Sequence, residues 1–272
     1  MRFGRLVAVL GVLVVMGCGN AALPAGQGGG VRAPTDPLGL VGTWQLNDAG
    51  DASGAVVRLA AGRISIEQGC RTLDGTWRAG WDGLFVADVT AGSPCPGDTD
   101  AAALSTPQWL AQAVRFEPVG TDAMLLDASG ARVARLSPSD APPLPYQEAP
   151  ESTVTDEARR AWQEPVPLPS AVVADGDLVG RWTPAGGGGS YAEFAATGEW
   201  TGSDGCNGDG GRWLTGSEGS FLASQAAATT LLGCPGVPVG SWLGQAARAG
   251  FDGATLVLLD ASGAEIGRLE RL

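Results

Sequence analysis

Short segments in which apolar and polar residues alternate, separated by turns that contain glycine, fill most of the chain after residue 38. Alternation with a period of two places successive side chains on opposite faces of a sheet, so each segment is predicted to be a β-strand. The clearest pairs are 56–59 with 63–66 and 192–194 with 199–201. Strands that follow one another across so few residues form antiparallel hairpins.

Further strands complete the predicted pattern in each half of the chain. One carries Trp77 or Trp213, the next covers 84–86 or 221–223, and the closing hairpin covers 123–126 with 132–136 or 255–259 with 265–269. The closing turn reads Asp-Ala-Ser-Gly in both halves. Its glycine supplies the left-handed residue that a tight hairpin needs.

One amphipathic helix is predicted in each half. Ser105-Thr106 ahead of Pro107 is typical of a helix cap followed by proline in the first turn. Apolar residues with helical spacing follow, namely Trp109, Leu110, Ala113 and Val114 in the first half and Trp242, Leu243, Ala246 and Ala247 in the second. We interpret this face as core rather than as a binding surface.

The two halves repeat one another. Leu40-Val41-Gly42-Thr43-Trp44 returns as Leu178-Val179-Gly180-Arg181-Trp182, and Leu-Leu-Asp-Ala-Ser-Gly-Ala occurs at both 125–131 and 258–264. The spacing between matched residues drifts by a few positions, as loop insertions between two copies of one fold produce. The predicted fold class is α+β and mostly β: two tandem small antiparallel β domains, each a partly open barrel with one short helix.

Shifts in composition place the domain boundaries. Gly, Ala and Pro dominate before the first strand, and prolines recur between the repeats, where Thr155–Glu164 is predicted to form a short helix with Trp162 docked on a domain. The predicted organisation is a lipoprotein signal peptide at 1–17, a flexible tether at 18–37, a first domain at 38–136, a proline-rich linker at 137–177 and a second domain at 178–272.

The N-terminus has the pattern of an export signal. Arg2 and Arg5 precede an apolar run from Leu6 to Val15, which is about half the length that spans a membrane. Gly17 before Cys18 resembles the bacterial lipobox. That resemblance implies cleavage after Gly17, a diacylglyceryl group on Cys18 and an exported protein anchored to the cell membrane on its extracytoplasmic side. An ordinary cleaved secretory signal is the alternative.

The five cysteines agree with an exported protein. With Cys18 reserved for lipid, two remain in each repeat, and thiols outside the cytoplasm tend to oxidise. Four cysteines allow three pairings, of which the repeat favours Cys70 with Cys95 and Cys206 with Cys234. A four-ligand metal site is disfavoured, because the chain has no histidine and no Cys-x-x-Cys pair.

Charge and composition exclude several functions. The 17 basic residues, all arginine, are outnumbered by 29 acidic ones, so the chain has a net charge of −12 that repels nucleic acid and anionic lipid head groups. Without histidine or lysine, the usual bases for a serine or cysteine nucleophile are missing, and we expect no enzyme. A carboxylate pair for sugar hydrolysis stays open as a remote alternative, although no two acids are marked by their context.

The second repeat resembles a META domain, the family that includes the bacterial heat-shock proteins of the HslJ type. The resemblance is carried by the opening Trp182, by Gly205-Cys206-Asn207 after a strand, by Thr230 four positions before Cys234, and then by the helix around Trp242 and the closing hairpin. The first repeat is a divergent version, with Arg71 in place of the Asn and Ala91 in place of the Thr. The resemblance implies a fold like a cracked barrel, a role in envelope stress or at the cell surface, and no established catalytic activity.

Two features remain as candidate binding chemistry. Asp204, Asn207 and Asp209 offer oxygens in a glycine-rich turn, but their spacing is not that of a calcium loop, and we interpret them as turn-forming. Most tryptophans are interpreted as core, but Trp81 has no equivalent in the second repeat. We expect no metal and no cofactor, and a binding or structural role toward an unidentified envelope protein or ligand. The alternative is a carrier that holds a hydrophobic small ligand in an open barrel.

Overall fold

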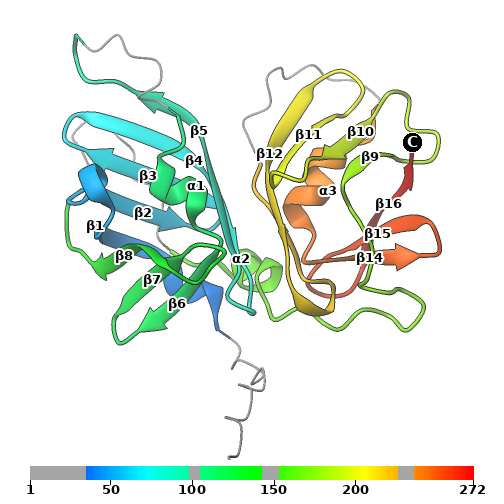
Figure 1. Ribbon diagram of the computed structural model, residues 1–272, viewed down its shortest axis with the longest axis horizontal. Helices are drawn as coiled ribbons and strands as arrows, with labels where there is room; N and C mark the ends of the chain where they lie inside the picture. Colours follow the sequence, from blue (N-terminus) through cyan, green and yellow to red (C-terminus); the bar gives the residue numbers. More distant parts are fainter. Residues whose placement is uncertain (1–34, 98–104, 143–152, 226–235) are drawn as a thin grey trace, which may run out of the picture. The chain divides into compact units, whose positions relative to one another are not determined.

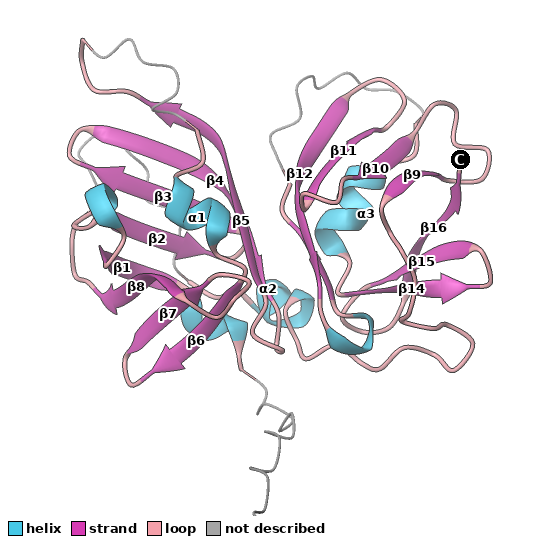
Figure 2. Cartoon of the chain, in the orientation of Figure 1, coloured by secondary structure: helices cyan, strands magenta, loops and turns pink. Residues whose placement is uncertain are grey.

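The computed structural model describes residues 35–97, 105–142, 153–225 and 236–272, and within them the chain forms two eight-stranded antiparallel sheets (Figure 1 and Figure 2). The first contains β1 (Gly42–Asn47), β2 (Val56–Ala60), β3 (Arg63–Gln68), β4 (Arg71–Ala79), β5 (Phe85–Ser93), β6 (Arg115–Val119), β7 (Asp122–Leu126) and β8 (Arg132–Pro138). The second contains β9 (Gly180–Thr183), β10 (Tyr191–Phe194), β11 (Glu199–Ser203), β12 (Gly208–Thr215), β13 (Phe221–Ala223), β14 (Arg248–Asp252), β15 (Thr255–Leu259) and β16 (Glu265–Arg271). The helices are α1 (Gln108–Gln112), α2 (Asp156–Ala161) and α3 (Val239–Gln245), with 3-10 turns at η1 (Pro37–Leu40), η2 (Gly50–Ala52) and η4 (Ser217–Gly219).

The two sheets have the same topology. The strand order is β5-β4-β3-β2-β1-β8-β7-β6 in the first and β13-β12-β11-β10-β9-β16-β15-β14 in the second, so adding eight to each strand number converts one into the other. One sheet forms a half-barrel and the other a nearly closed barrel. In both, one isolated bridge links the two edges, Leu84 with Arg115 and Ser220 with Arg248. The predicted fold class, with two tandem antiparallel β domains, is confirmed.

Large apolar side chains fill the inner face of each sheet. The largest fully buried ones include Trp77, Trp182, Trp200, Phe85, Phe116 and Phe194. The opening tryptophans of the two repeats, Trp44 and Trp182, each donate the indole N–H to the carbonyl four residues earlier, at 2.8 and 2.7 Å. The repeated Leu-Val-Gly-x-Trp segment therefore fixes the start of each domain to its core while satisfying a buried donor.

Helices α1 and α3 pack into the two cores, as the apolar spacing predicts. The buried residues of the two helices and their ends are Trp109, Leu110 and Ala113 in the first domain and Val239, Leu243 and Ala246 in the second. Both helices are short, so tertiary packing rather than intrinsic propensity holds them.

The predicted Ser105-Thr106 cap of α1 is wrong. Pro107 occupies the cap position, and no side chain bonds the first turn. The Thr106 hydroxyl instead donates to Asp88 at 2.6 Å and accepts from the amide of Val89 at 3.0 Å. Strand β5 thus takes the hydroxyl that the sequence pattern assigns to the helix.

Residues 153–177, which we call the strap, contact both β domains. Helix α2 begins after Thr155, whose hydroxyl accepts from the amide of Ala158 at 3.1 Å, so the predicted cap and helix are confirmed. Trp162 packs edge-on against Trp77, with 4.7 Å between ring centroids, in the core of the first domain. Further along, Val173 pairs with Phe251 on β14, an edge strand of the second sheet, and covers part of that edge.

The two β domains belong to one compact unit, Ala33–Leu272, and meet through equivalent strands. Strands β4 and β5 contact β12 and β13. Leu84 and Val86 pack there against Leu222 and the partly buried Leu214. Val86 and Leu222 are matched positions of the two repeats. Each lies two residues after the isolated bridge that links the edges of its sheet, at Leu84 or Ser220. The interface therefore has approximate two-fold character within one chain.

Several predictions concern residues outside the described ranges. They are the signal peptide at 1–17, Cys18 and the tether up to residue 34, together with Thr230 and Cys234. None of the described helices combines the length and the apolar character needed to cross a membrane.

Candidate functional site

The Gly205-Cys206-Asn207 segment forms the turn between β11 and β12. The Asp204 carboxylate organises it, because Oδ1 accepts from the amides of Cys206 at 2.9 Å and Asn207 at 2.6 Å, while the Asn207 side chain donates to Oδ2 at 2.7 Å. These bonds, that of the Asn207 side chain first, lower the pKa of Asp204. These contacts between Asn207 and Asp204 shape the turn, as the turn-forming interpretation predicts.

Asp209 lies in a different environment, at the start of β12 and beneath α3. Its carboxylate accepts from the Gln225 side chain at 3.0 Å and from the amide of Gly210 at 2.8 Å. A Cβ added to Gly240 of α3 would lie 1.9 Å from Oδ2, so only glycine leaves room for this oxygen. Burial raises the pKa of Asp209. Across the described ranges, no cluster of three or more His, Cys, Asp or Glu residues could hold a metal ion.

A disulfide crosslinks the first domain. Cys70 bonds Cys95, with 5.1 Å between their Cα atoms, and joins the β3–β4 turn to the end of β5. Cys206 is also disulfide-bonded. The partner that the repeat predicts for it, Cys234, lies outside the described residues.

Trp81, the tryptophan without a counterpart in the second repeat, fixes the strap. Its indole N–H donates to the carbonyl of Trp162 at 2.9 Å. Its own carbonyl accepts from the amide of Thr35 at 2.8 Å. Only the first domain receives Trp162, which explains why only the first repeat has this tryptophan.

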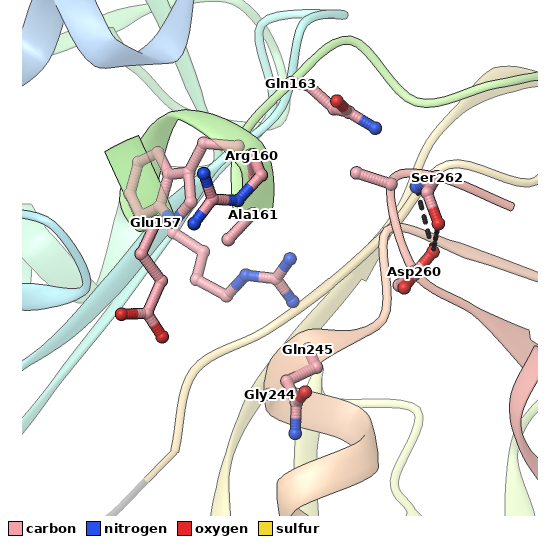
Figure 3. A pocket seen from close by; sticks show the side chains of 11 residues that line it. Glu157, Arg160, Ala161, Gln163, Gly244, Gln245, Asp260 and Ser262 are labelled. Atoms are coloured by element: carbon pink, nitrogen blue, oxygen red, sulfur yellow. Dashed lines mark hydrogen bonds between the residues drawn. The ribbon is translucent and has the colours of Figure 1, made fainter. Parts of the chain in front are cut away.

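A cavity of about 470 Å³ lies between the strap, α3 and the first domain (Figure 3). Its wall is formed by Arg78 of β4, by Glu157, Arg160, Ala161, Trp162 and Gln163 of the strap, by Gly244 and Gln245 of α3, and by Asp260, Ala261 and Ser262 in the turn between β15 and β16. The volume is within the range of small-molecule sites. Four separate stretches of chain must therefore come together before the cavity exists.

Arg78 is the polar centre of this wall. It reaches from the first domain to the end of α3, where Nη1 donates to the carbonyls of Ala246 at 2.6 Å and Leu243 at 3.4 Å. These carbonyls have no partner within the helix. Burial lowers the pKa of Arg78 to about 10, so the guanidinium keeps its charge at neutral pH. Within the described ranges, no carboxylate lies at ion-pair distance from it.

The two acidic residues of the wall differ in how available they are to a ligand. Asp260 Oδ1 accepts from the hydroxyl and amide of Ser262 and from the amide of Ala264, at 2.7 to 3.0 Å, and so is engaged in its own turn (Figure 3). Glu157 and Arg160 are exposed on α2 and form no ion pair with each other or with another described residue.

Sequence reasoning missed this site. Arg78 is a polar residue on the outer face of a strand whose inner face carries Trp77, and alternation assigns such a residue to solvent. The one available signal was the repeat itself, because the matched position in the second domain is the apolar Leu214. An arginine in one repeat where the other has leucine indicates that the two positions make different contacts, and Arg78 bonds the end of α3 whereas Leu214 packs in an apolar cluster.

Comparison of the chain with protein-family models, with curated proteins and with solved structures finds no match in any of the three.

Proposed function

We propose that this chain is a non-enzymatic binding protein of the bacterial cell envelope, exported and anchored through a lipid on Cys18. The export pattern at 1–17, the lipobox-like Gly17-Cys18 and the disulfide between Cys70 and Cys95 support the location. The resemblance of its repeats to META domains supports a role in envelope stress or at the cell surface.

The observation that carries the binding role is the cavity of about 470 Å³ at Arg78. Arg78 lines this cavity as a partly buried charge. Its hydrogen bonds to the end of α3 help to join the two domains but supply no carboxylate partner, and burying a charge without a counter-charge is costly. Both β domains and the strap contribute to the wall. The tandem arrangement therefore has a use that one copy lacks.

The carrier alternative has less support. A hydrophobic ligand held inside a barrel needs empty space there, and the interiors are occupied by Trp77, Trp182 and Trp200, each at most 1 % exposed. Native mass spectrometry of the protein extracted from membranes separates the two proposals. Copurified lipid that stays bound in the folded protein would favour the carrier.

The anchor is tested by Cys18→Ser. We expect the unaltered chain in the membrane fraction, with an intact mass that starts at residue 18 and includes a diacylglyceryl group, and the variant in the soluble fraction. Ala21→Ser, which changes a nearby residue but keeps the cysteine, should behave like the unaltered chain. An unaltered chain whose residue 18 carries no lipid would contradict the proposal.

A further inference from the structure

We propose that the cavity binds a small organic anion, one that presents a carboxylate or phosphate group to Arg78 and Arg160 and carries a hydroxyl or amino donor. This deepens the binding role proposed above. It does not depend on the anchor, so the mass measurement on Cys18 and the binding measurement described here fail independently.

Two arginines give the cavity wall its charge. Arg78 and Arg160 line one cavity, and no described carboxylate pairs with either. Arg78 uses Nη1 on two helix-end carbonyls, which carry only partial charge and leave the guanidinium without a full counter-charge. A planar guanidinium favours carboxylate and phosphate oxygens over other partners. An anion is therefore the ligand that this wall lacks.

The other residues of the wall and its volume limit which anions fit. Glu157 is an exposed acceptor on α2, one helical turn before Arg160, and it would repel a ligand that is anionic throughout. The same carboxylate accepts a hydrogen bond from a hydroxyl or amino group. A volume of about 470 Å³ has room for a compact metabolite-sized molecule and excludes a folded partner domain.

The strap places part of the cavity wall. Arg160 and Trp162 belong to it, and Trp162 is held by its edge-on contact with Trp77 and by the hydrogen bond from Trp81. Arg78 is held from the other side by the end of α3. Arg78 thus belongs to the first domain and Arg160 to the strap, so a ligand that bridges them stabilises the form in which the strap lies against that domain.

The test is isothermal titration calorimetry on the full chain with four probes. Gluconate and glycerol 3-phosphate combine an anionic group with hydroxyl donors, propionate lacks the donors, and glycerol lacks the charge. We expect heat of binding with gluconate or glycerol 3-phosphate, weaker binding with propionate and none with glycerol. Whichever of the first two binds more tightly identifies the head group as carboxylate or phosphate.

Three variants locate the binding. Arg160→Gln and Arg78→Gln should each weaken it about tenfold or more, because each removes a charge-assisted hydrogen bond. Arg159→Gln is the matched control: it makes the same charge change on the same helix, at an exposed residue outside the wall. Arg160 is exposed, so its variant keeps the test valid if Arg78→Gln fails to fold. No heat with any anionic probe at millimolar concentration, or equal binding by all three variants, would overturn the proposal.

Discussion

The surroundings of two aspartates shift their pKa values in opposite directions. Asp127 accepts from Ser129 and Ala131 in an exposed turn, and these bonds lower its pKa. Asp209 is partly buried against Gly240, and burial raises its pKa. The two residues therefore make opposite contributions to how stability changes with acidity.

The prediction at this scale compares Asp209→Asn with Asp127→Asn. A raised pKa in the folded state favours folding at low pH, so the unaltered chain should lose stability relative to Asp209→Asn as pH rises from the ordinary aspartate pKa through the raised one. A lowered pKa has the opposite effect. The unaltered chain should be more stable than Asp127→Asn above the ordinary aspartate pKa, and this difference should disappear as pH falls through the lowered pKa. Urea unfolding from pH 3 to 7 measures both changes in the free energy of unfolding. Parallel curves for the two variants would contradict the assignment.

At the scale of elements, strands of each domain reach the helix of the other. Arg78 of β4 donates to carbonyls at the end of α3. Arg212 of β12 donates to the carbonyls of Leu110 and Ala111 near the end of α1, and to that of Ala87 in β5. Cations at helix C-termini complement both the free carbonyls and the dipole. These crossed contacts join the two cores without a shared sheet.

Arg212→Gln is expected to lower the free energy of unfolding by about 1–3 kcal/mol, because partly buried carbonyls lose a charged donor. Arg159→Gln, an exposed change on the strap, should shift it by less than about 0.5 kcal/mol. Guanidinium unfolding followed by tryptophan fluorescence measures the difference. Equal midpoints for the two variants would show that the crossed contact adds nothing to stability.

The elements that could be predicted are those whose local pattern and packing agree. The hairpins at 123–136 and 255–269 have both alternation and a glycine turn, and the structure forms them as β7–β8 and β15–β16. Strands β6 and β14 were not predicted. Pro118 lies within β6, where proline is tolerated since β6 is an edge strand. The bonds from Thr106 to β5 and the cavity wall at Arg78 could not be predicted, because the partners are distant in sequence.

At the scale of the molecule, the two repeats face each other as two subunits of a symmetric dimer would. Val86 and Leu222, matched residues of the two copies, lie in the same small apolar cluster. Isologous contacts of this kind are self-complementary, and their contact residues lie in the folded domains and not in the segment that joins them. The connection between the domains should therefore be dispensable once both have folded.

Cutting the chain tests this directly. A protease site inserted within 143–152 and cleaved after folding should leave two fragments that elute together in size-exclusion chromatography. Leu222→Asp places a charge in the buried cluster and should let the cleaved fragments separate. Leu272→Asp, the same change at a residue that is 77 % exposed, should not. Separation of the cleaved unaltered chain would show that covalent linkage alone holds the halves together.

The hydrogen bond from the Thr35 amide to the Trp81 carbonyl attaches the start of the folded region at a defined place in the first domain. The same tryptophan bonds the carbonyl of Trp162. Tension on the preceding segment is thus applied next to the wall that contains Arg160, far along the chain from either closing hairpin. In a protein tethered through that segment, a pulling force would act first on the region that forms the cavity wall.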